Sequence, residues 1–287
     1  MKKPILYFCL LICYLTIQSC TKSKDGTPSP KTPTAKAGDD QVAFVGELVG
    51  LDGSASTDPT GASLTYKWSF NSKPSGSTAN IINADKAKPE FSPDKVGEYI
   101  ATLTVSNGTS EGKVNTKITA GAGPFLTEFL NQSSLKYAKD TGSNSPGDAG
   151  YQFVSSKDIK VTHLAILLPE PGKYMVTIWN PQSTGVIYQG EVEQKAIGSL
   201  GSAKIAPNPI ELAKDKKYII SVYYGGSPIY AADKVGGGNI FPYTNQAITV
   251  EGSRISSGSN AKPSFPSSTF QELYKNRGFV SFAYVEK

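Results

Sequence analysis

The chain has 287 residues, of which 29 are Lys or Arg and 24 are Asp or Glu, so its formal net charge is +5. Such a small and dispersed excess of positive charge excludes the concentrated basic surface by which proteins bind nucleic acids. The chain also holds a single His and three Cys, and all three Cys lie within its first 20 residues. We therefore expect neither a Ser/His or Cys/His catalytic pair nor a metal site, and no cofactor.

The N-terminal segment has the pattern of an export signal. Lys2 and Lys3 give a positive start, and residues 5–17 form an uncharged, largely apolar run that is too short to span a bilayer comfortably. Residues 17–20, Ile-Gln-Ser-Cys, resemble the lipobox of bacterial lipoproteins. The resemblance implies that residues 1–19 are a signal peptide and that Cys20 is the site of lipid attachment. The alternative is an ordinary secretory signal in which Cys20 is incidental.

Cleavage before Cys20 would remove Cys9 and Cys13, so the mature domains would depend on hydrophobic cores and not on disulfides. The net charge would fall to +3, because 27 basic residues would then face 24 acidic ones. The lipid is predicted to be the membrane attachment. Thr21, rather than Asp, follows the lipidated Cys, and this resembles lipoproteins of the outer membrane. We expect a cell-envelope protein in the outer membrane that is exposed at the cell surface.

Residues 20–36 are predicted to form a disordered tether. After Cys20 the segment reads TKSKDGTPSPKTPTAK, with three prolines and no large apolar residue, so it cannot bury enough surface to fold. In an extended polyproline form at about 3.1 Å per residue, it would reach roughly 50 Å from the bilayer.

Residues 37–121 are predicted to form a β-sandwich. Residues 99–105 alternate between apolar residues and residues such as threonine, which is typical of a half-buried antiparallel strand. Asp52-Gly53 and residues 57–61 are turn signals between further short strands. Strands at this spacing favour a sandwich of about seven strands.

The same segment resembles the PKD (polycystic kidney disease) domain, an immunoglobulin-like sandwich common in bacterial surface proteins. The motifs that carry the resemblance are AGDDQ at 37–41, LDGSASTDP at 51–59, LTYKW at 64–68, PEFSPD at 89–94, GEY at 97–99 and LTVSNG at 103–108. One departure follows Trp68, where Ser-Phe-Asn-Ser-Lys replaces the Asp-Phe-Gly-Asp-Gly of many members. The resemblance implies a spacer or adhesion module, not a catalyst.

Two features of this domain have competing interpretations. Trp68 is predicted to be a core residue, as a Trp in this part of an immunoglobulin-like sandwich usually is. Asp52, Asp58 and Asp94 offer the oxygen ligands that calcium prefers, but capping of turns explains Asp52 and Asp58 equally well. We therefore predict no metal site here.

Residues 122–287 are predicted to form a second, jelly-roll-like β-sandwich. Runs rich in β-branched and aromatic residues are separated by Pro-Gly, Asn-Pro and Gly-Gly turn signals, and they lie at 159–168, 174–179, 186–192, 217–224, 247–250 and 279–285. Small, flexible residues at 121–123 place the domain boundary there. The predicted fold class is all-β, an immunoglobulin-like PKD sandwich followed by a jelly-roll-like β-sandwich.

Residues 147–232 resemble a bacterial domain of unknown function that is found beside sandwich modules in surface and glycan-associated proteins. The motifs are GYQF at 150–153, TIW at 177–179, GVIY at 185–188, PIELA at 209–213 and YIISVYY at 218–224. The family has no assigned activity, so the function has to be argued from individual residues.

Aromatic and polar side chains are interleaved in the glycine-rich segment 223–246. An aromatic face packs against the C–H surface of a sugar while planar polar groups bind its hydroxyls, and loops on a rigid sandwich are a common place for such a site. We predict a ligand-binding site formed by Tyr230, Asp233, Asn239, Phe241, Tyr243 and Asn245. The alternative is that these aromatic residues pack in the core. His163 is predicted to be a half-exposed sheet residue and not a base.

The sequence therefore predicts a lipid-anchored, non-catalytic surface protein that binds an extracellular glycan or protein partner through its C-terminal domain, with the PKD-like domain as a spacer. Two alternatives stay open, a purely structural envelope protein and a glycan-active hydrolase whose carboxylates are not evident in the sequence.

Replacing the predicted lipidation site tests the export signal. Cys20→Ala should abolish lipid attachment and cleavage at this position, because the thiol is the acceptor of the lipid. Metabolic labelling with a fatty-acid analogue measures this, and label retained on the variant would contradict the lipobox.

Overall fold

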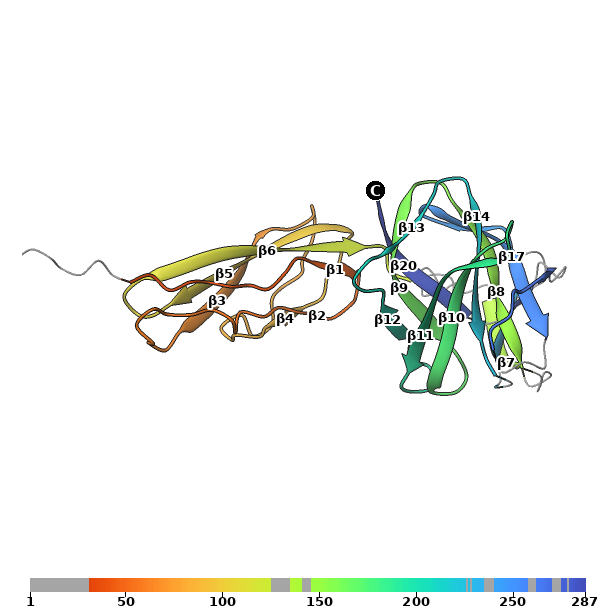
Figure 1. Cartoon of the computed structure of the whole chain (residues 1–287), viewed down its shortest axis with the longest axis horizontal. Coiled ribbons are helices and arrows are strands. Elements are labelled where there is room, and N and C mark those ends of the chain that lie inside the picture. Colours follow the sequence, from red (N-terminus) through yellow and green to blue (C-terminus); the bar gives the residue numbers. More distant parts are fainter. Residues whose placement is uncertain are drawn as a thin grey trace, which may run out of the picture.

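The computed structural model describes residues 31–124, 135–140, 146–225, 227, 229–234, 240–257, 262–269, 275–277 and 279–287. For residues 135–140, 230–234, 257 and 275–277 it describes the backbone alone. Two β domains lie end to end, the first coloured orange to yellow and the second green to blue (Figure 1). Within the described ranges, no helix is long and apolar enough to cross a membrane. The predicted all-β fold class is confirmed.

The first domain is a sandwich of two sheets. The larger sheet has the order β1-β6-β5-β3, and a short β2-β4 pair forms the other. The strands are β1 (Gln41–Phe44), β2 (Val49–Gly50), β3 (Thr65–Ser72), β4 (Glu90–Phe91), β5 (Gly97–Ser106) and β6 (Glu111–Gly121). These are six strands among the described residues, where about seven were predicted, because residues 73–89 between β3 and β4 are mostly turns and irregular backbone.

Alternation along β5 builds the core of the first domain. Tyr99, Ala101, Leu103 and Val105 are all fully buried, while the residues between them are half-buried on the outer face. Trp68 packs against this row and is buried, which confirms its prediction as a core residue. The period of two in the sequence therefore corresponds to one buried and one outward face, as expected of an antiparallel strand.

The N-terminal limit of this domain differs from the prediction. Thr34 pairs through its backbone with Thr57, and Ala35 packs against the core. The Lys36 amide also donates a hydrogen bond to the Ser56 hydroxyl at 3.0 Å. The prediction that the tether extends to residue 36 is wrong, because residues 34–36 already form contacts with the sandwich.

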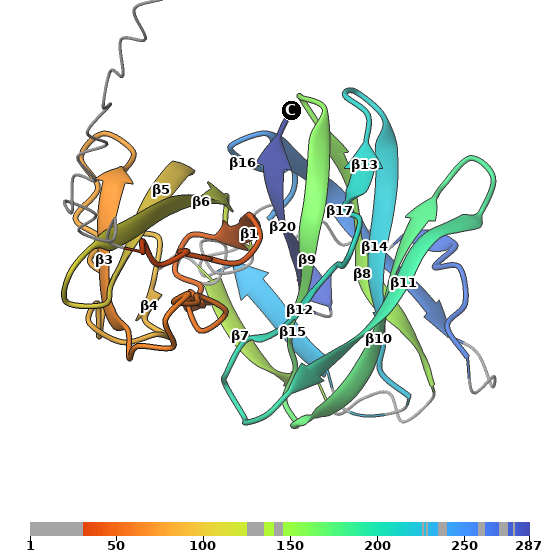
Figure 2. The ribbon, with the colours of Figure 1, turned by 60° about the vertical axis from the view of Figure 1, so that its left-hand side comes forward.

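The second domain has three sheets around one core (Figure 2). A seven-stranded sheet has the order β11-β10-β14-β8-β17-β16, with β18 paired to β17. A four-stranded sheet places β12 and β13 on one side of β9 and β20 on the other, and a three-stranded sheet has the order β19-β15-β7. The strands are β7 (Leu135–Asp140), β8 (Gly147–Ser155), β9 (Ile159–Leu167), β10 (Gly172–Asn180), β11 (Gly185–Gln194), β12 (Gly201–Lys204), β13 (Ile210–Leu212), β14 (Lys217–Tyr223), β15 (Ile229–Lys234), β16 (Tyr243–Asn245), β17 (Ile248–Ser257), β18 (Ser268–Thr269), β19 (Lys275–Arg277) and β20 (Phe279–Glu286).

The core of this domain lies between the seven-stranded sheet and the sheet around β9. Ile220 and Val222 of β14 face Phe282 of β20 within one cluster of buried residues. Phe282 packs on Phe153 of β8 with 4.8 Å between their ring centroids. Tyr218, Ile220, Val222 and Tyr224 alternate along this segment, and all four lie in or against the same core.

The two domains have separate cores, yet the segment between them is packed and not a free linker. β6 extends to Gly121, and Ala122 forms an isolated β-bridge with Tyr284 of β20. A Cβ atom at Gly121 would lie 2.0 Å from the Tyr284 carbonyl oxygen. The small residues that suggested flexibility are therefore required by the close approach of two backbones.

Removing one large core side chain from each domain tests whether the two cores unfold separately. Phe282→Ala should lower the free energy of unfolding of the second domain by about 3–5 kcal/mol, because both the ring and its packing are lost. Phe91→Ala should do the same to the first domain, since Phe91 is also fully buried. Calorimetry should show one transition moving while the other stays, whereas transitions that move together would indicate one cooperative unit.

Candidate functional site

The residues predicted to bind a ligand lie on two different sheets. Tyr230 and Asp233 belong to β15 of the three-stranded sheet, whereas Tyr243 and Asn245 belong to β16, at one edge of the seven-stranded sheet. Asn239 lies outside the described residues, as do the side chains of Tyr230 and Asp233. The sequence segment 223–246 is therefore divided between sheets.

Phe241 corrects the predicted site. Its side chain is 3% exposed and belongs to the core of the second domain, so the prediction that this ring faces solvent is wrong. Tyr243 is half-buried and packs against the same core, and Asn245 is half-buried. The described aromatic residues near β16, Phe241 and Tyr243, thus contribute to the hydrophobic core, which explains why aromatic residues occur in this segment.

The outer face of the seven-stranded sheet carries a row of mostly polar side chains that the alternation within a single strand does not reveal. Glu191, Met175, Tyr223, Asp148 and Ser256 are successive partners across β11, β10, β14, β8 and β17. Their neighbours along each strand, such as Val176 and Val222, face the core. Because side chains alternate, the five residues share the opposite, outer face.

A second row runs parallel to the first, two residues further along each strand. It contains Gln189, Thr177, Ser221, Gly150 and Arg254. The Gln189 side-chain amide donates to the Thr177 hydroxyl at 3.0 Å. Gly150 has no room for a side chain, since a Cβ atom there would lie 2.0 Å from a neighbouring backbone oxygen. The outer face is thus polar along this row, with a gap at the glycine.

Residues 262–267, here named the strap, cross part of this outer face. The Ser264 amide donates to Asp148 Oδ2 at 2.7 Å, and the Ser221 hydroxyl donates to Asp148 Oδ1 at 3.0 Å. The Trp179 indole N–H in turn donates to the Ser221 oxygen at 2.9 Å. Phe265 of the strap meets Trp179 edge to face at 5.8 Å. The strap therefore buries Asp148 and Trp179.

Beside the strap the row opens into a hollow of about 340 Å³, here named the tyrosine hollow. The residues that line it are Lys173, Tyr174, Met175, Glu191, Tyr223, Tyr224, Gly225, Ser227 and Pro263. Lys173 Nζ and Glu191 form an ion pair at 2.9 Å, and both side chains are largely exposed. Tyr223 is half-buried, so part of its surface is available at the hollow. The hollow combines aromatic surface with one positive and one negative group.

Burial changes the charge behaviour of Asp148. Removal from water raises the pKa of its carboxyl from 3.8 to about 6, although hydrogen bonds from Ser264 and Ser221 act in the opposite direction. A buried carboxylate with only two donors is costly, so the protonated form is favoured well above the usual range. Asp148 therefore supports the strap from beneath and changes charge in mildly acidic solution.

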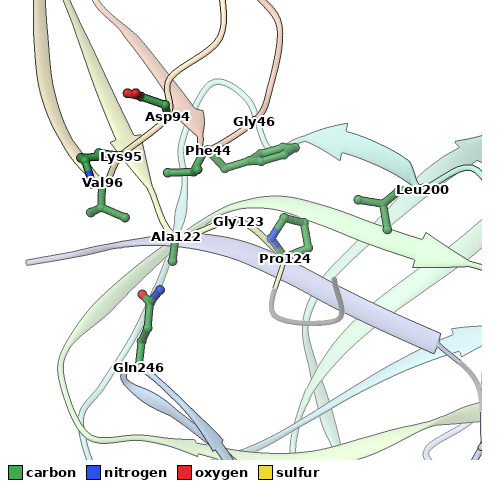
Figure 3. Close-up of a pocket in the computed structure, with 11 residues that line it drawn as sticks. Phe44, Gly46, Asp94, Lys95, Val96, Ala122, Gly123, Pro124, Leu200 and Gln246 are labelled. Carbon is green, nitrogen blue, oxygen red and sulfur yellow. The ribbon is translucent and has the colours of Figure 1, made fainter. Parts of the chain in front are cut away.

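A larger hollow of about 510 Å³ lies between the domains (Figure 3). Phe44, Val96 and Leu200 give it apolar walls, and Gln246 reaches toward Ala122 from the other side. The Asp94 carboxylate in its wall is less available to a ligand, because it already accepts hydrogen bonds from Ser77 and Thr78. This interdomain cleft has fewer of the features of a sugar site than the tyrosine hollow.

The three aspartates considered as calcium ligands each cap a separate turn. Asp52 accepts hydrogen bonds from Ser54, and Asp58 accepts them from Thr60. These contacts lower the pKa of both carboxyls to about 2, with Lys88 contributing most at Asp52. No group of three His, Cys, Asp or Glu side chains in the described part of the chain is placed to hold a metal ion.

Comparison with known families identifies the first domain. Residues 37–119 match the family described as K319L-like, PKD domain. They form a PKD domain. This confirms the resemblance that the motifs at 37–41, 51–59 and 64–68 implied.

Solved structures similar to this chain include two PKD domains. One is from the KIAA 1837 protein, with 30% identity over 32% of this chain and 90% of that chain and a TM-score of 0.26. The other is from human KIAA0319, with 23% identity over 33% and 88% and a TM-score of 0.27. A nucleoside hydrolase-related hypothetical protein from Saccharophagus degradans, associated with carbohydrate metabolism, is 24% identical over 32% of this chain and 26% of its own length, with a TM-score of 0.27. TM-scores of this size say nothing about activity.

Sequence reasoning did not identify Lys173, Glu191 and Met175 as site residues. They come from two strands that precede the aromatic segment, and only the register of β10, β11 and β14 brings them beside Tyr223. The sequence feature that could have pointed to them is the pair of alternating runs at 174–179 and 186–192. The outward positions of these runs include Met175, Thr177, Gln189 and Glu191.

Asp148→Asn tests the buried carboxyl. In the wild type, the folded state keeps a proton that the unfolded state releases between pH 3.8 and about 6, so this group makes stability fall as pH rises through that window. The loss is about 3 kcal/mol in total, and the uncharged Asn variant should lack it. Urea unfolding between pH 4 and pH 7 measures the difference. The exposed Asp215→Asn is the control, and an Asp148→Asn profile parallel to the wild type would refute the shift.

Proposed function

We propose that this is a lipid-anchored, non-catalytic protein of the cell surface that binds an extracellular glycan in the tyrosine hollow. The PKD domain supports the coarser part of this proposal, because it suggests a surface or adhesion-type module. The alternatives are a purely structural envelope protein and a glycan-active hydrolase.

The order of segments supports a spacer role for the PKD domain. It lies in sequence between Cys20, the proposed lipid site, and the second domain, which lies at its far end (Figure 1). Lipid attachment at Cys20 would hold the chain in the outer membrane, and surface exposure would present the second domain to a glycan or a surface protein. In this proposal the protein has two partners: the membrane, which it contacts through the lipid, and the glycan or surface protein.

The observation that carries glycan binding is the row of Glu191, Met175 and Tyr223 on adjacent strands at the tyrosine hollow. Tyr223 offers ring surface for the C–H face of a sugar, and Lys173 and Glu191 offer a donor and an acceptor for its hydroxyls. All of these side chains stand on β-strands and not on long loops, so the site is held rigid before a ligand arrives.

Hydrolysis is less well supported than binding. Glu191 and Asp148 are the carboxyls of the row, and they stand three strands apart, or roughly 14 Å between backbones at about 4.8 Å per strand. Glycosidase carboxyls are about 5–10 Å apart. In addition, Asp148 is covered by the strap through Ser264. This pair therefore does not have the arrangement of a general acid and a nucleophile.

Glycan-array screening of residues 21–287, followed by calorimetry on a retained glycan, tests the site. Tyr223→Ala should weaken binding about tenfold, because an aromatic contact contributes up to about 1.5 kcal/mol. Tyr223→Phe keeps the ring and should bind nearly as well as the wild type.

The ion pair offers a matched control. Lys173 and Lys217 each pair with a carboxylate at 2.9 Å and are similarly exposed, but only Lys173 lines the tyrosine hollow. Lys173→Ala should therefore weaken glycan binding while Lys217→Ala leaves it unchanged. Equal effects of the two variants would refute the tyrosine hollow as the site, and release of shortened glycan would favour the hydrolase.

A further inference from the structure

A β-bulge in the central strand of the four-stranded sheet directs His163 toward the PKD domain. In the pairing of β9 with β20, His163 opposes Ala283 and Val161 opposes Tyr284, so Thr162 is an extra residue. A bulge of this kind changes the direction of the neighbouring side chain. His163 is consequently 1% exposed, and the prediction that it is a half-exposed sheet residue is wrong.

The partners of His163 come from the end of β1 and from the turn that follows it in the PKD domain. The Phe44 ring meets the imidazole edge to face, at 5.1 Å between centroids and 82° between planes. Glu47 Oε1 lies 3.3 Å from His163 Nε2. The other oxygen of Glu47 accepts a hydrogen bond from the Phe44 amide at 3.0 Å, which holds the carboxylate in place. One buried side chain of the second domain is therefore held by two residues of the first.

The hydrogen positions around the imidazole follow from its contacts. His163 Nδ1 lies 3.0 Å from the Thr162 hydroxyl, whose single hydrogen is donated to the Ala283 carbonyl at 3.2 Å. The Thr162 oxygen can then only accept, so Nδ1 carries a hydrogen. Nε2 faces a carboxylate, which also only accepts. Nε2 has no hydrogen-bond partner among the described residues, although Glu47 Oε1 lies 3.3 Å from it, so a proton on Nε2 would turn this contact into an attraction between opposite charges.

The charges that face His163 come from each side of the joint. Glu47 lies opposite it on the PKD domain, and Lys204 is its partner across the ladder with β12. Burial raises the pKa of the Glu47 carboxyl, but the nearby His163, the hydrogen bond from the Phe44 amide and the charge of Lys204 outweigh it, so the pKa is lowered from its usual value. Glu47 thus stays ionised in mildly acidic solution and can attract a protonated imidazole.

Backbone contacts add a second point of attachment beside this side-chain cluster. The Tyr284 amide donates to the Ala122 carbonyl at 3.4 Å, and the Val45 amide donates to the Gly121 carbonyl at 3.1 Å. The turn that carries Glu47 and the end of β6 are therefore bound to each other and to β20. Two separate contacts between rigid elements are enough to restrict rotation about the chain connection.

We propose that Phe44, Glu47 and His163 lock the PKD domain to the second domain in one orientation, and that the lock requires protonated His163. The spacer and the second domain then form a rigid rod in mildly acidic solution and a hinged pair in alkaline solution. The direction of this pH effect follows from the charges. Deprotonation of His163 would remove its attraction to Glu47 and leave a lone pair facing a carboxylate. This proposal does not depend on the ligand of the second domain.

Distance measurements between two spin labels test the lock. Residues 21–287 contain no Cys, so Ser75→Cys on the PKD domain and Ser183→Cys on the second domain, both exposed, can be labelled uniquely. At about pH 5.5 we expect a single narrow distance distribution, and at about pH 9 a broad one, because histidine changes charge between these values. Glu47→Gln should give the broad distribution at both pH values.

Glu111→Gln is the matched control, since Glu111 pairs with Lys113 at the same 3.3 Å within the PKD domain and away from the joint. It should behave as the wild type at both pH values. Because His163 is the single histidine, nitrogen NMR of its ring also reports directly whether both nitrogens carry hydrogen at pH 5.5. A wild-type distribution that does not change with pH, a Glu47→Gln variant that stays narrow, or a singly protonated ring at pH 5.5 would each overturn the proposal.

Discussion

The register of the seven-stranded sheet is the constraint on which the second domain depends. Because side chains alternate along every strand, fixing which residues of β8, β10, β11 and β14 stand side by side also fixes two complete faces. One face is the hydrophobic core, in which Val176 and Val222 are fully buried. The other collects Glu191, Met175, Tyr223 and Asp148 in a row. A slip of one residue in any strand would exchange these faces, so the stability of the core also maintains the candidate site.

The outer face is not uniformly open, and its covered part has an energetic cost. The strap places Phe265 on Trp179 and the Ser264 amide on Asp148, which gains aromatic contact and a charge-assisted hydrogen bond. It also removes a carboxyl from water, and the raised pKa of Asp148 is the measure of that cost. The tyrosine hollow lies where this cover ends, with Pro263 of the strap as part of its wall. Folding of the strap and the shape of the hollow are therefore linked through one segment.

The joint between the domains shows how the PKD domain can set the orientation of the second domain as well as its distance. The connection at Gly121 and Ala122 is short, and a β-bridge to Tyr284 leaves it little freedom. The interdomain cleft is formed on one side by Phe44 and Val96 of the PKD domain and on the other by Leu200 and Gln246 (Figure 3). With His163 packed against Phe44 and Glu47, movement of one domain would break an aromatic contact and a polar contact at once. Such a joint would hold the second domain in one direction relative to the PKD domain.

The sequence by itself determined the features that depend on local pattern. Alternation along residues 99–105 predicted β5 and its buried face, and the motifs around Trp68 predicted the PKD domain, because strand period and turn chemistry are written in consecutive residues. Only the tertiary structure decided which strands are neighbours, and with this the position of every candidate site. Phe241 is core and not surface, and Lys173 and Glu191 meet near Tyr223, through pairings between residues far apart in the chain. His163 is the clearest case: a bulge opposite β20 redirects it toward the PKD domain, and its partners Phe44 and Glu47 precede it by more than a hundred residues. Contacts of that separation depend on how whole sheets pack, which no local pattern records.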